Sequence, residues 1–246
     1  MTQVLAVLGE GVTEAPVIDT AAALAEIAHA QVRRISLAGD LSAERAAAQV
    51  LGALHNPGIV LAVLARDERS RPIWRRVVQR SARPVVLVPA AARGRQPKIR
   101  RVLLPLDGTA ESAAAVAGAV EQFARAGVDL VVLHVFDAET VPRFWDQAAH
   151  ARKAWAEEFL ARYCAQPGAR LELRTGVTGE HVLDVAEAER ADLIALGWSQ
   201  QLDPGRARTV RLAVLDAVIP VMLVPMATDG TFGPGRRPVR PDRVTV

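Results

Sequence analysis

Short apolar runs alternate with alanine-rich amphipathic stretches along most of the chain. Runs such as VLLPL at 102–106 and LVVLHV at 130–135 have the length and β-branched content of buried strands. The stretches between the runs repeat their apolar positions at helical spacing. Strands that alternate with helices in this way form β-α-β units, in which each helix returns the chain to a parallel strand. The pattern predicts an α/β protein with helices on both faces of its sheets.

The second half of the chain carries the pattern most completely. Strands are expected at residues 102–106, 130–135, 170–174, 192–196 and 220–224. Helices are expected at residues 110–126, 146–164, 179–190 and 207–217. Thr109 is suited to cap the first of these helices. In the second helix Trp155, Phe159 and Tyr163 recur at every fourth position, which predicts a stripe that packs on the core.

The first half repeats the pattern with one unit fewer. VLAVLG at 4–9 matches VLLPLD at 102–107 with an offset of 98 residues, whereas PVVLVP at 84–89 matches PVMLVP at 220–225 with an offset of 136. The offset therefore grows by about 38 residues, the length of one β-α unit. We predict that the first copy has four strands against five. The missing unit is expected between Ala30 and Gly39, as the counterpart of the strand and helix in 129–165.

The repeat also suggests the domain organisation and the way in which the two copies meet. Residues 1–90 form the shortened copy, 91–99 a linker, 100–227 the full copy and 228–246 a tail rich in Gly, Pro and Arg that is expected to be disordered. PVVLVP and PVMLVP are the last strands of their copies and therefore sheet edges. Because unpaired apolar edges promote aggregation, we predict that these two strands pair antiparallel and join the sheets.

Composition excludes several classes of protein. The only cysteine, Cys164, rules out an internal disulfide and is expected to pack as a small apolar side chain. The N-terminus lacks a charged signal region, and the longest apolar run is broken by Asp216 and Pro220, so a cytoplasmic protein without a membrane span is expected. A net charge of +3, with neither half strongly basic, argues against nucleic acid. The five histidines never recur at metal-ligand spacing, so no metal site is expected.

Candidate site residues stand at the ends of two strands of the second half. The first strand ends in Leu106, Asp107 and Gly108, and the fourth in Gly197, Trp198 and Ser199. If the strand order is 3-2-1-4-5, these ends meet in the crevice where open parallel sheets bind ligands. Asp107 would then hold a ligand, Gly197 would allow close backbone approach, and Trp198 could stack on a base or simply pack. Alternatively, Asp107-Gly108 is only a turn that caps the following helix.

Four segments in this order and spacing resemble a universal stress protein domain. They read RVLLPLDGTAESAAAVAGAV, LVVLHVFD, GVTGEHVLDVAEAERADLIALGWS and AVIPVMLVP, and together span residues 100–225. A weaker resemblance covers 1–90, so the chain is similar to a tandem universal stress protein with a degenerate first domain. The resemblance implies two open parallel-sheet α/β domains of the adenine nucleotide alpha hydrolase-like (Rossmann-like) type, with strand order 3-2-1-4-5 in the second. It also implies a pseudo-dimer within the chain, alone or within a further homodimer.

The same resemblance implies a nucleotide site. Some members bind ATP through an Asp at the end of the first strand, a Val at the end of the second, and a Gly-x2-Gly-x9-Gly-Ser/Thr loop after the fourth. Asp107, Val135 and Gly197 match this pattern, whereas Gln200 and Ala207-Arg208 replace the other motif residues. Such glycines let backbone N–H groups wrap a phosphate. Because other residues replace them here, ATP is expected to bind weakly or not at all.

Two further features bear on the ligand. Gly205, Arg206, Arg208 and Thr209 open the next helix; they could bind another anion through two guanidinium groups and a hydroxyl, or simply be solvated. The first copy has Gly9 in the place of Asp107 and no glycine in its corresponding loop, ARDERSRPIW. No nucleotide is expected there, and that copy is assigned the structural role of a dimer partner.

Three functions remain open from the sequence. The leading hypothesis is a non-enzymatic stress-response protein that senses a nucleotide or another anion and signals to a protein partner of unknown identity. ATP or another adenine nucleotide is the candidate ligand, with Mg²⁺ accompanying ATP and no other metal. The alternatives are an interaction protein that has lost its ligand and a weak ATPase. No phosphate-binding loop of the Gly-x4-Gly-Lys-Ser/Thr type and no catalytic residues are identified.

Overall fold

The computed structural model describes residues 1–9, 14–90, 98–136, 149–200 and 207–226. The first half consists of β1 (Gln3–Gly9), α1 (Glu14–Ile27), β2 (Gln31–Leu37), α2 (Ala43–Leu54), β3 (Ile59–Arg66), α3 (Arg71–Arg80) and β4 (Val85–Pro89). The second half consists of β5 (Arg101–Pro105), α4 (Ala110–Arg125), β6 (Asp129–Phe136), α5 (Ala149–Tyr163), β7 (Arg170–Thr175), α6 (Thr178–Ala188), β8 (Leu193–Trp198), α7 (Ala207–Asp216) and β9 (Val221–Pro225).

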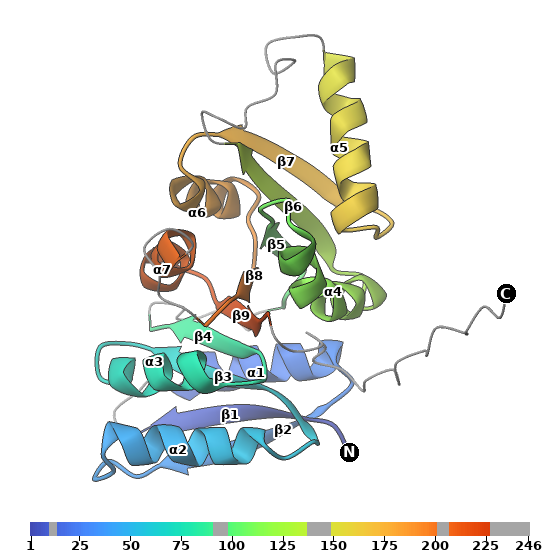
Figure 1. Ribbon diagram of the computed structural model, residues 1–246. Coiled ribbons are helices and arrows are strands. Elements are labelled where there is room, and N and C mark those ends of the chain that lie inside the picture. Colours follow the sequence, from blue (N-terminus) through green and yellow to red (C-terminus); the bar gives the residue numbers. More distant parts are fainter. Residues whose placement is uncertain (10–13, 91–97, 137–148, 201–206, 227–246) are drawn as a thin grey trace, which may run out of the picture.

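All of these strands belong to one nine-stranded sheet in the order β2-β1-β3-β4-β9-β8-β5-β6-β7 (Figure 1). Read from β7 inward, the second half has the predicted order 3-2-1-4-5. Neighbouring strands are parallel except β4 and β9, which pair antiparallel with Val86 opposite Met222. The predicted antiparallel pairing of the two last strands is therefore confirmed, and it fuses the two expected sheets into one.

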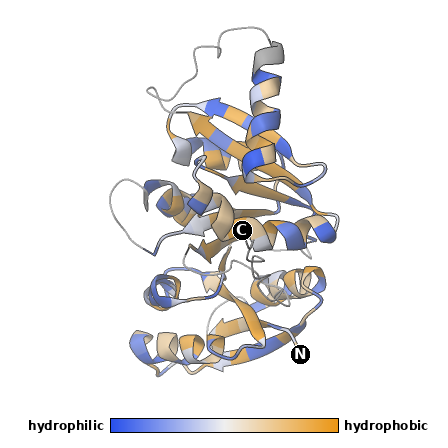
Figure 2. Cartoon of the chain, turned by 45° about the vertical axis from the view of Figure 1, so that its right-hand side comes forward, coloured by the Kyte–Doolittle hydropathy of each residue, from blue (hydrophilic) through white to orange (hydrophobic). Residues whose placement is uncertain are grey.

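The sheet is covered on both faces, as the alternating pattern predicts. One apolar core lies between the sheet and helices α1, α4 and α5; the other lies between the sheet and helices α2, α3, α6 and α7. The strands are largely hydrophobic, and hydrophilic residues lie on the outer faces of the helices (Figure 2). Cys164 is buried as expected, and burial raises the pKa of its thiol to about 11. Both cores continue across the β4–β9 pair, so the two halves share their apolar interior.

The missing unit of the first half differs from the prediction. Among the described residues the first half has four strands and the second half five, as predicted, but β2 pairs with β1 as β6 pairs with β5, at the same offset of 98 residues. The first half therefore keeps the counterpart of 130–135, and the prediction that the unit matching 129–165 is lost was wrong. The segment without a counterpart is α5 and β7. The sequence pattern concealed β2 because it is an edge strand with Arg33 and Arg34 exposed, as charged edges commonly are.

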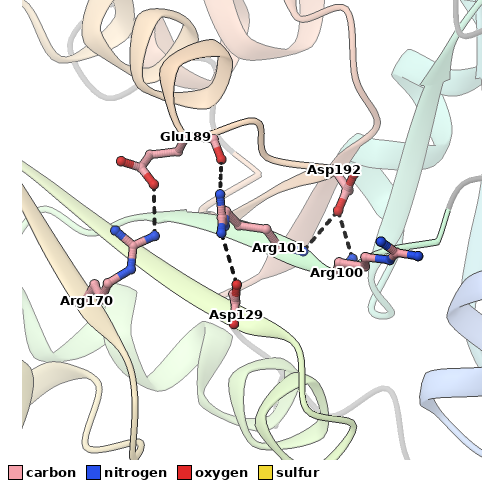
Figure 3. Close-up of polar contacts among 6 residues, drawn as sticks. All are labelled: Arg100, Arg101, Asp129, Arg170, Glu189 and Asp192. Carbon is pink, nitrogen blue, oxygen red and sulfur yellow. Dashed lines mark hydrogen bonds and ion pairs between the residues drawn. The ribbon is translucent and has the colours of Figure 1, made fainter.

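A polar network ties the amino ends of β5, β6 and β7 to the end of α6 (Figure 3). Asp192 Oδ2 accepts from the backbone N–H groups of Arg100 and Arg101 at 2.8 and 3.0 Å. The Arg101 guanidinium donates to Asp129 Oδ2 at 3.1 Å and to the Glu189 carbonyl at 2.5 Å, and Arg170 reaches Glu189 Oε2 at 2.9 Å. These bonds satisfy polar groups at the amino ends of the strands. Ligands bind such sheets at the carboxyl ends, on the opposite edge.

Polar side chains also join the halves beside the β4–β9 seam. Trp198 Nε1 donates to the Val78 carbonyl at 3.2 Å, and Gln200 Nε2 donates to the Ser81 carbonyl. From the other half, the Arg66 guanidinium donates to the carbonyls of Val214 and Ala217. Val78 and Val214, like Ser81 and Ala217, are 136 residues apart, which is the offset of the paired strands. Each half therefore donates to equivalent carbonyls at the end of the other half's helix.

Candidate functional site

A pocket of about 460 Å³ opens at the carboxyl ends of β5 and β6, beneath α5. Four of the predicted site residues line it, namely Leu106, Asp107, Gly108 and Val135. The rest of the wall comes from His134 and Phe136 on β6, from α5, and from Thr178. The pocket therefore occupies the crevice that the strand-end argument predicts, with α5 as its outer wall.

Asp107 is held at the start of α4. Its Oδ1 accepts from Thr109 N at 2.9 Å, from Thr109 Oγ1 at 2.7 Å and from Ser112 Oγ at 2.5 Å. Thr109 is the N-cap, as predicted, and its hydroxyl accepts from Ser112 N. Gly108 has φ +79°, a conformation that a side chain rarely adopts. The turn-and-cap reading of Asp107-Gly108 is thus correct, and the same residues still line the pocket.

His134 packs against three aromatic side chains that line the pocket with it. Its Nδ1 lies 2.9 Å from the Leu106 carbonyl, which can only accept, so Nδ1 carries the proton of this bond. Its ring centroid lies 4.6 Å from that of Phe136, 5.5 Å from Trp155 and 4.8 Å from Phe159. His134 is therefore hydrogen-bonded and half-buried, and it lines the pocket.

The residues of α5 are the part of the site that the sequence reasoning missed. Phe159 is buried as predicted, but Trp155 and Tyr163 are only half-buried and line the pocket. Their spacing of four residues was correctly interpreted as one helix face. That spacing does not reveal that the face covers the ends of β5 and β6, where the core opens into a cavity.

Stability is expected to depend on pH through His134. Burial lowers its pKa below the ordinary 6.5, outweighing the hydrogen bond to Leu106 and the charge of Asp107, which both raise it. The unfolded chain therefore takes up a proton at a higher pH than the folded protein. This contribution to stability is present above pH 6.5 and is lost as the pH falls through the folded-state pKa.

Urea unfolding of the wild type and His134→Gln at pH 7.5 and pH 5 would measure this effect. We expect the wild type to lose more stability than the variant on acidification, because the Gln side chain does not titrate. Equal losses of stability in the two proteins would contradict the claim that His134 causes this pH dependence.

The predicted residues at the end of β8 do not line the Asp107 pocket. Gly197 packs against the first turn of α4, where an added Cβ would sit 3.5 Å from the Ser112 carbonyl oxygen. Trp198 is 3% exposed, bonds to Val78 of the other half and does not line the Asp107 pocket, an arrangement that favours the packing alternative. Its buried indole finds its acceptor across the seam, which turns it away from the pocket. Ser199 is half-buried and does not line the pocket.

The predicted anion-binding residues are only partly within the described chain. Gly205 and Arg206 lie outside the described residues. Arg208 lies 3.8 Å from Glu180 in an ion pair whose side chains are both more than 60% exposed, a geometry that contributes little stability. Thr209 is half-buried in the first turn of α7 and, like Arg208, is not part of the Asp107 pocket. The structure therefore separates the predicted residues that line the Asp107 pocket from those that do not, and of the latter Trp198 bonds to the first half.

Gln200, in the place of a motif glycine, adopts φ +62°. This is the left-handed region that glycine favours. The backbone at Gln200 therefore has a glycine-like conformation although the residue carries a side chain. Its side chain is directed to Ser81 of the first half. The residue that replaces the motif glycine therefore forms a hydrogen bond between the two halves.

The first half has a smaller crevice of about 290 Å³ at the carboxyl ends of β1 and β3. Gly9 stands there in the place of Asp107, and no Asp or Glu lines the crevice within the described chain. Among the described residues no three His, Cys, Asp or Glu side chains gather as a metal site would require. Nor does any helix in the described ranges have the length and apolar character needed to cross a membrane.

Comparison with known proteins gives one family and a set of similar folds. Residues 98–225 match the model of the universal stress protein family. None of the curated proteins matches the chain. A universal stress protein from Archaeoglobus fulgidus is 16% identical over 92% of this chain and 86% of its own, with a TM-score of 0.55.

Two further solved structures are similar. A functionally unknown protein from Pseudomonas aeruginosa PAO1 is 13% identical over 92% of each chain, with a TM-score of 0.63. A universal stress protein in complex with cAMP is 19% identical over 52% of this chain and 98% of its own, with a TM-score of 0.40. At such identities, the structures with scores above 0.5 establish a shared fold and nothing finer.

Proposed function

This chain belongs to the universal stress protein family, and from that premise we propose that it is a non-enzymatic regulatory protein that binds an adenine nucleotide in its second half. Proteins of this family are generally regulatory. We propose further that the chain is a tandem member acting in the cytoplasm. Its shortened first half takes the place of a dimer partner by pairing β4 with β9.

The observation that carries the proposal is the pocket beside Asp107. The exposed carboxylate can accept hydrogen bonds from the hydroxyls of a ribose. The rings of Trp155, His134 and Phe159 offer apolar faces beside it, and such faces stack on bases of any kind. Acceptor and aromatic wall together suit the nucleoside part of a ligand.

The phosphates have weaker support. Arg162 is the one cationic side chain in the described lining of the pocket and shares that lining with the carboxylate of Glu158, whereas Arg208 pairs with Glu180 outside the pocket. The loop also lacks most of the glycines that wrap phosphates in the family. We therefore propose that AMP and ATP bind with similar, weak affinity, because the added phosphates gain few contacts.

A specific observation favours a second function, an interaction protein without a ligand. Asp107 Oδ1 already accepts three hydrogen bonds from Thr109 and Ser112. In this alternative the carboxylate is only a helix cap. The proposed nucleotide site and the capping role are separated by the experiment that follows.

Calorimetric titration with AMP, ADP, cAMP and Mg-ATP tests the proposal. We expect binding of AMP that weakens at least tenfold in Asp107→Ala, because a charge-assisted hydrogen bond is typically worth about 1.5–3 kcal/mol. Ser42→Ala is the matched control, since it removes the N-cap bond from Arg45 N at the start of α2, at a cost of about 1 kcal/mol, and Ser42 does not line the pocket. That variant should bind as the wild type does.

Other outcomes of the titration identify the alternatives. No binding of any nucleotide would refute the proposal and leave the interaction protein. Tight binding of Mg-ATP would refute the weak-phosphate claim, and release of inorganic phosphate above the blank would indicate a hydrolase.

A further inference from the structure

A second pocket, of about 220 Å³, lies on the seam between the two halves. Helices α3 and α7 flank it on the same face of the sheet, on either side of the β4–β9 pair (Figure 1). Its walls are apolar and include Trp74, Val78, Trp198, Val214 and Leu223. It is separate from the Asp107 pocket, with which it shares no lining residue.

The seam pocket is built from equivalent positions of the two halves. Val78 and Val214 are 136 residues apart, and so are Arg75 and Arg211, which is also the offset of the paired strands. All four residues line the pocket. The cavity therefore straddles the local two-fold relation between the halves and presents a guanidinium group from each side.

The charges at this pocket have one sign. Arg71, Arg75 and Arg211 line it, and no Asp or Glu does within the described chain. Arg71 is paired with Glu68 at 3.2 Å. Arg75 and Arg211 are exposed, and the described part of the protein offers neither side chain a hydrogen bond or an ion pair. Two free guanidinium groups thus stand above an apolar floor.

The floor contains an unsatisfied donor. Trp74 is 6% exposed, and its Nε1 has no hydrogen-bond partner among the described residues, whereas the Trp198 indole is satisfied. Buried donors without partners are rare in native proteins and commonly mark a place where a ligand or ordered water belongs. This observation is independent of the arginine pair.

We propose that the seam pocket binds a small apolar carboxylate. Its hydrocarbon part would lie on the floor formed by Trp74 and Trp198, and its carboxylate would bond to Arg75 and Arg211, because the guanidinium fork matches carboxylate geometry. A volume below the 300–1,000 Å³ usual for drug-sized ligands indicates a molecule of one or two rings or a short acyl chain.

1-Naphthoate is a suitable probe, and 1-naphthalenemethanol is its uncharged counterpart. Calorimetry and intrinsic tryptophan fluorescence of the full chain would follow both. We expect the carboxylate to bind at least tenfold more tightly than the alcohol. The double variant Arg75→Gln/Arg211→Gln should lose about tenfold in affinity for the carboxylate, because it removes both charge contacts to the probe. Its affinity for the alcohol should not change.

Two further variants make the result specific. Arg34→Gln/Arg45→Gln removes the same charge at two exposed positions away from the pocket and should bind as the wild type does. Val210→Phe places a larger side chain in the pocket wall and should abolish binding of both probes. Circular dichroism verifies that each variant is folded.

Several results would overturn the proposal. They are absence of naphthoate binding, equal affinity for the alcohol, or an affinity unaffected by the Arg75 and Arg211 substitutions. Leu215 at the pocket and nearby Val218 are 44% and 74% exposed, so a second copy of the chain is the competing occupant. A dimer in sedimentation that Val210→Phe dissociates would assign the pocket to that interface instead.

Discussion

Replacing Val86 by Asp is expected to remove about 3–5 kcal/mol of stability and to destabilise both halves together. Val86 is completely buried in β4, opposite Met222 of β9. A carboxylate there would have no partner among the apolar side chains of its core, and an uncompensated buried charge costs about that much. Since both apolar cores cross the seam, neither half is expected to remain folded when the seam fails.

Val218→Asp is the matched control, because it makes the same chemical change at a side chain that is 74% exposed. It should change stability by less than about 0.5 kcal/mol. Urea unfolding followed by circular dichroism and by tryptophan fluorescence would measure both variants. Two separate transitions in Val86→Asp, or a loss below about 1 kcal/mol, would show that the halves are independent.

Replacing Arg66 by Leu is expected to cost about 2–4 kcal/mol. The Arg66 guanidinium donates to the Val214 and Ala217 carbonyls at the end of α7, where helix carbonyls lack partners within the helix. Burial lowers the pKa of the Arg66 guanidinium, whereas the negative charge of Asp216 raises it by a smaller amount. Leucine would leave both carbonyls unsatisfied, and hydrogen bonds to charged groups are each worth about 1.5–3 kcal/mol.

Arg69→Leu is the control for this prediction, since Arg69 is exposed in the loop that follows β3. It should change stability by less than about 0.5 kcal/mol. Trp198→Phe, which removes the equivalent but uncharged bond to Val78, should cost less than Arg66→Leu. Thermal unfolding would rank the three variants. A loss for Arg66→Leu no larger than for Arg69→Leu would mean that the seam does not depend on this bond.

Much of the fold follows from local sequence. The β-branched runs and helical spacings predicted the strands and helices of the second half, and Thr109 was identified as the cap of α4. The matching strands PVVLVP and PVMLVP predicted the seam, because two apolar edges in one chain are best satisfied by each other. β2 escaped detection because an edge strand needs no continuous apolar run.

The candidate site was predictable only in part. Asp107, Gly108 and Val135 were found from strand ends and from family resemblance, and they do line one pocket. Trp198 was misplaced because a strand end alone does not reveal the direction of a buried indole. Trp155 and Tyr163 were interpreted as core residues because periodicity cannot distinguish a packed face from a pocket wall.

By itself the sequence determined the alternation of strands and helices, the repeat and the pairing of its last strands, since these depend on local propensity and on periods of a few residues. Only the tertiary structure decided which distant groups meet. His134 reaches Leu106, Trp198 reaches Val78, and Arg66 reaches Val214 across separations of 28 to 148 residues. Contacts over such separations arise when the crossovers of the sheet bring strand ends and helix ends together, and no pattern along the chain encodes the direction of each side chain there.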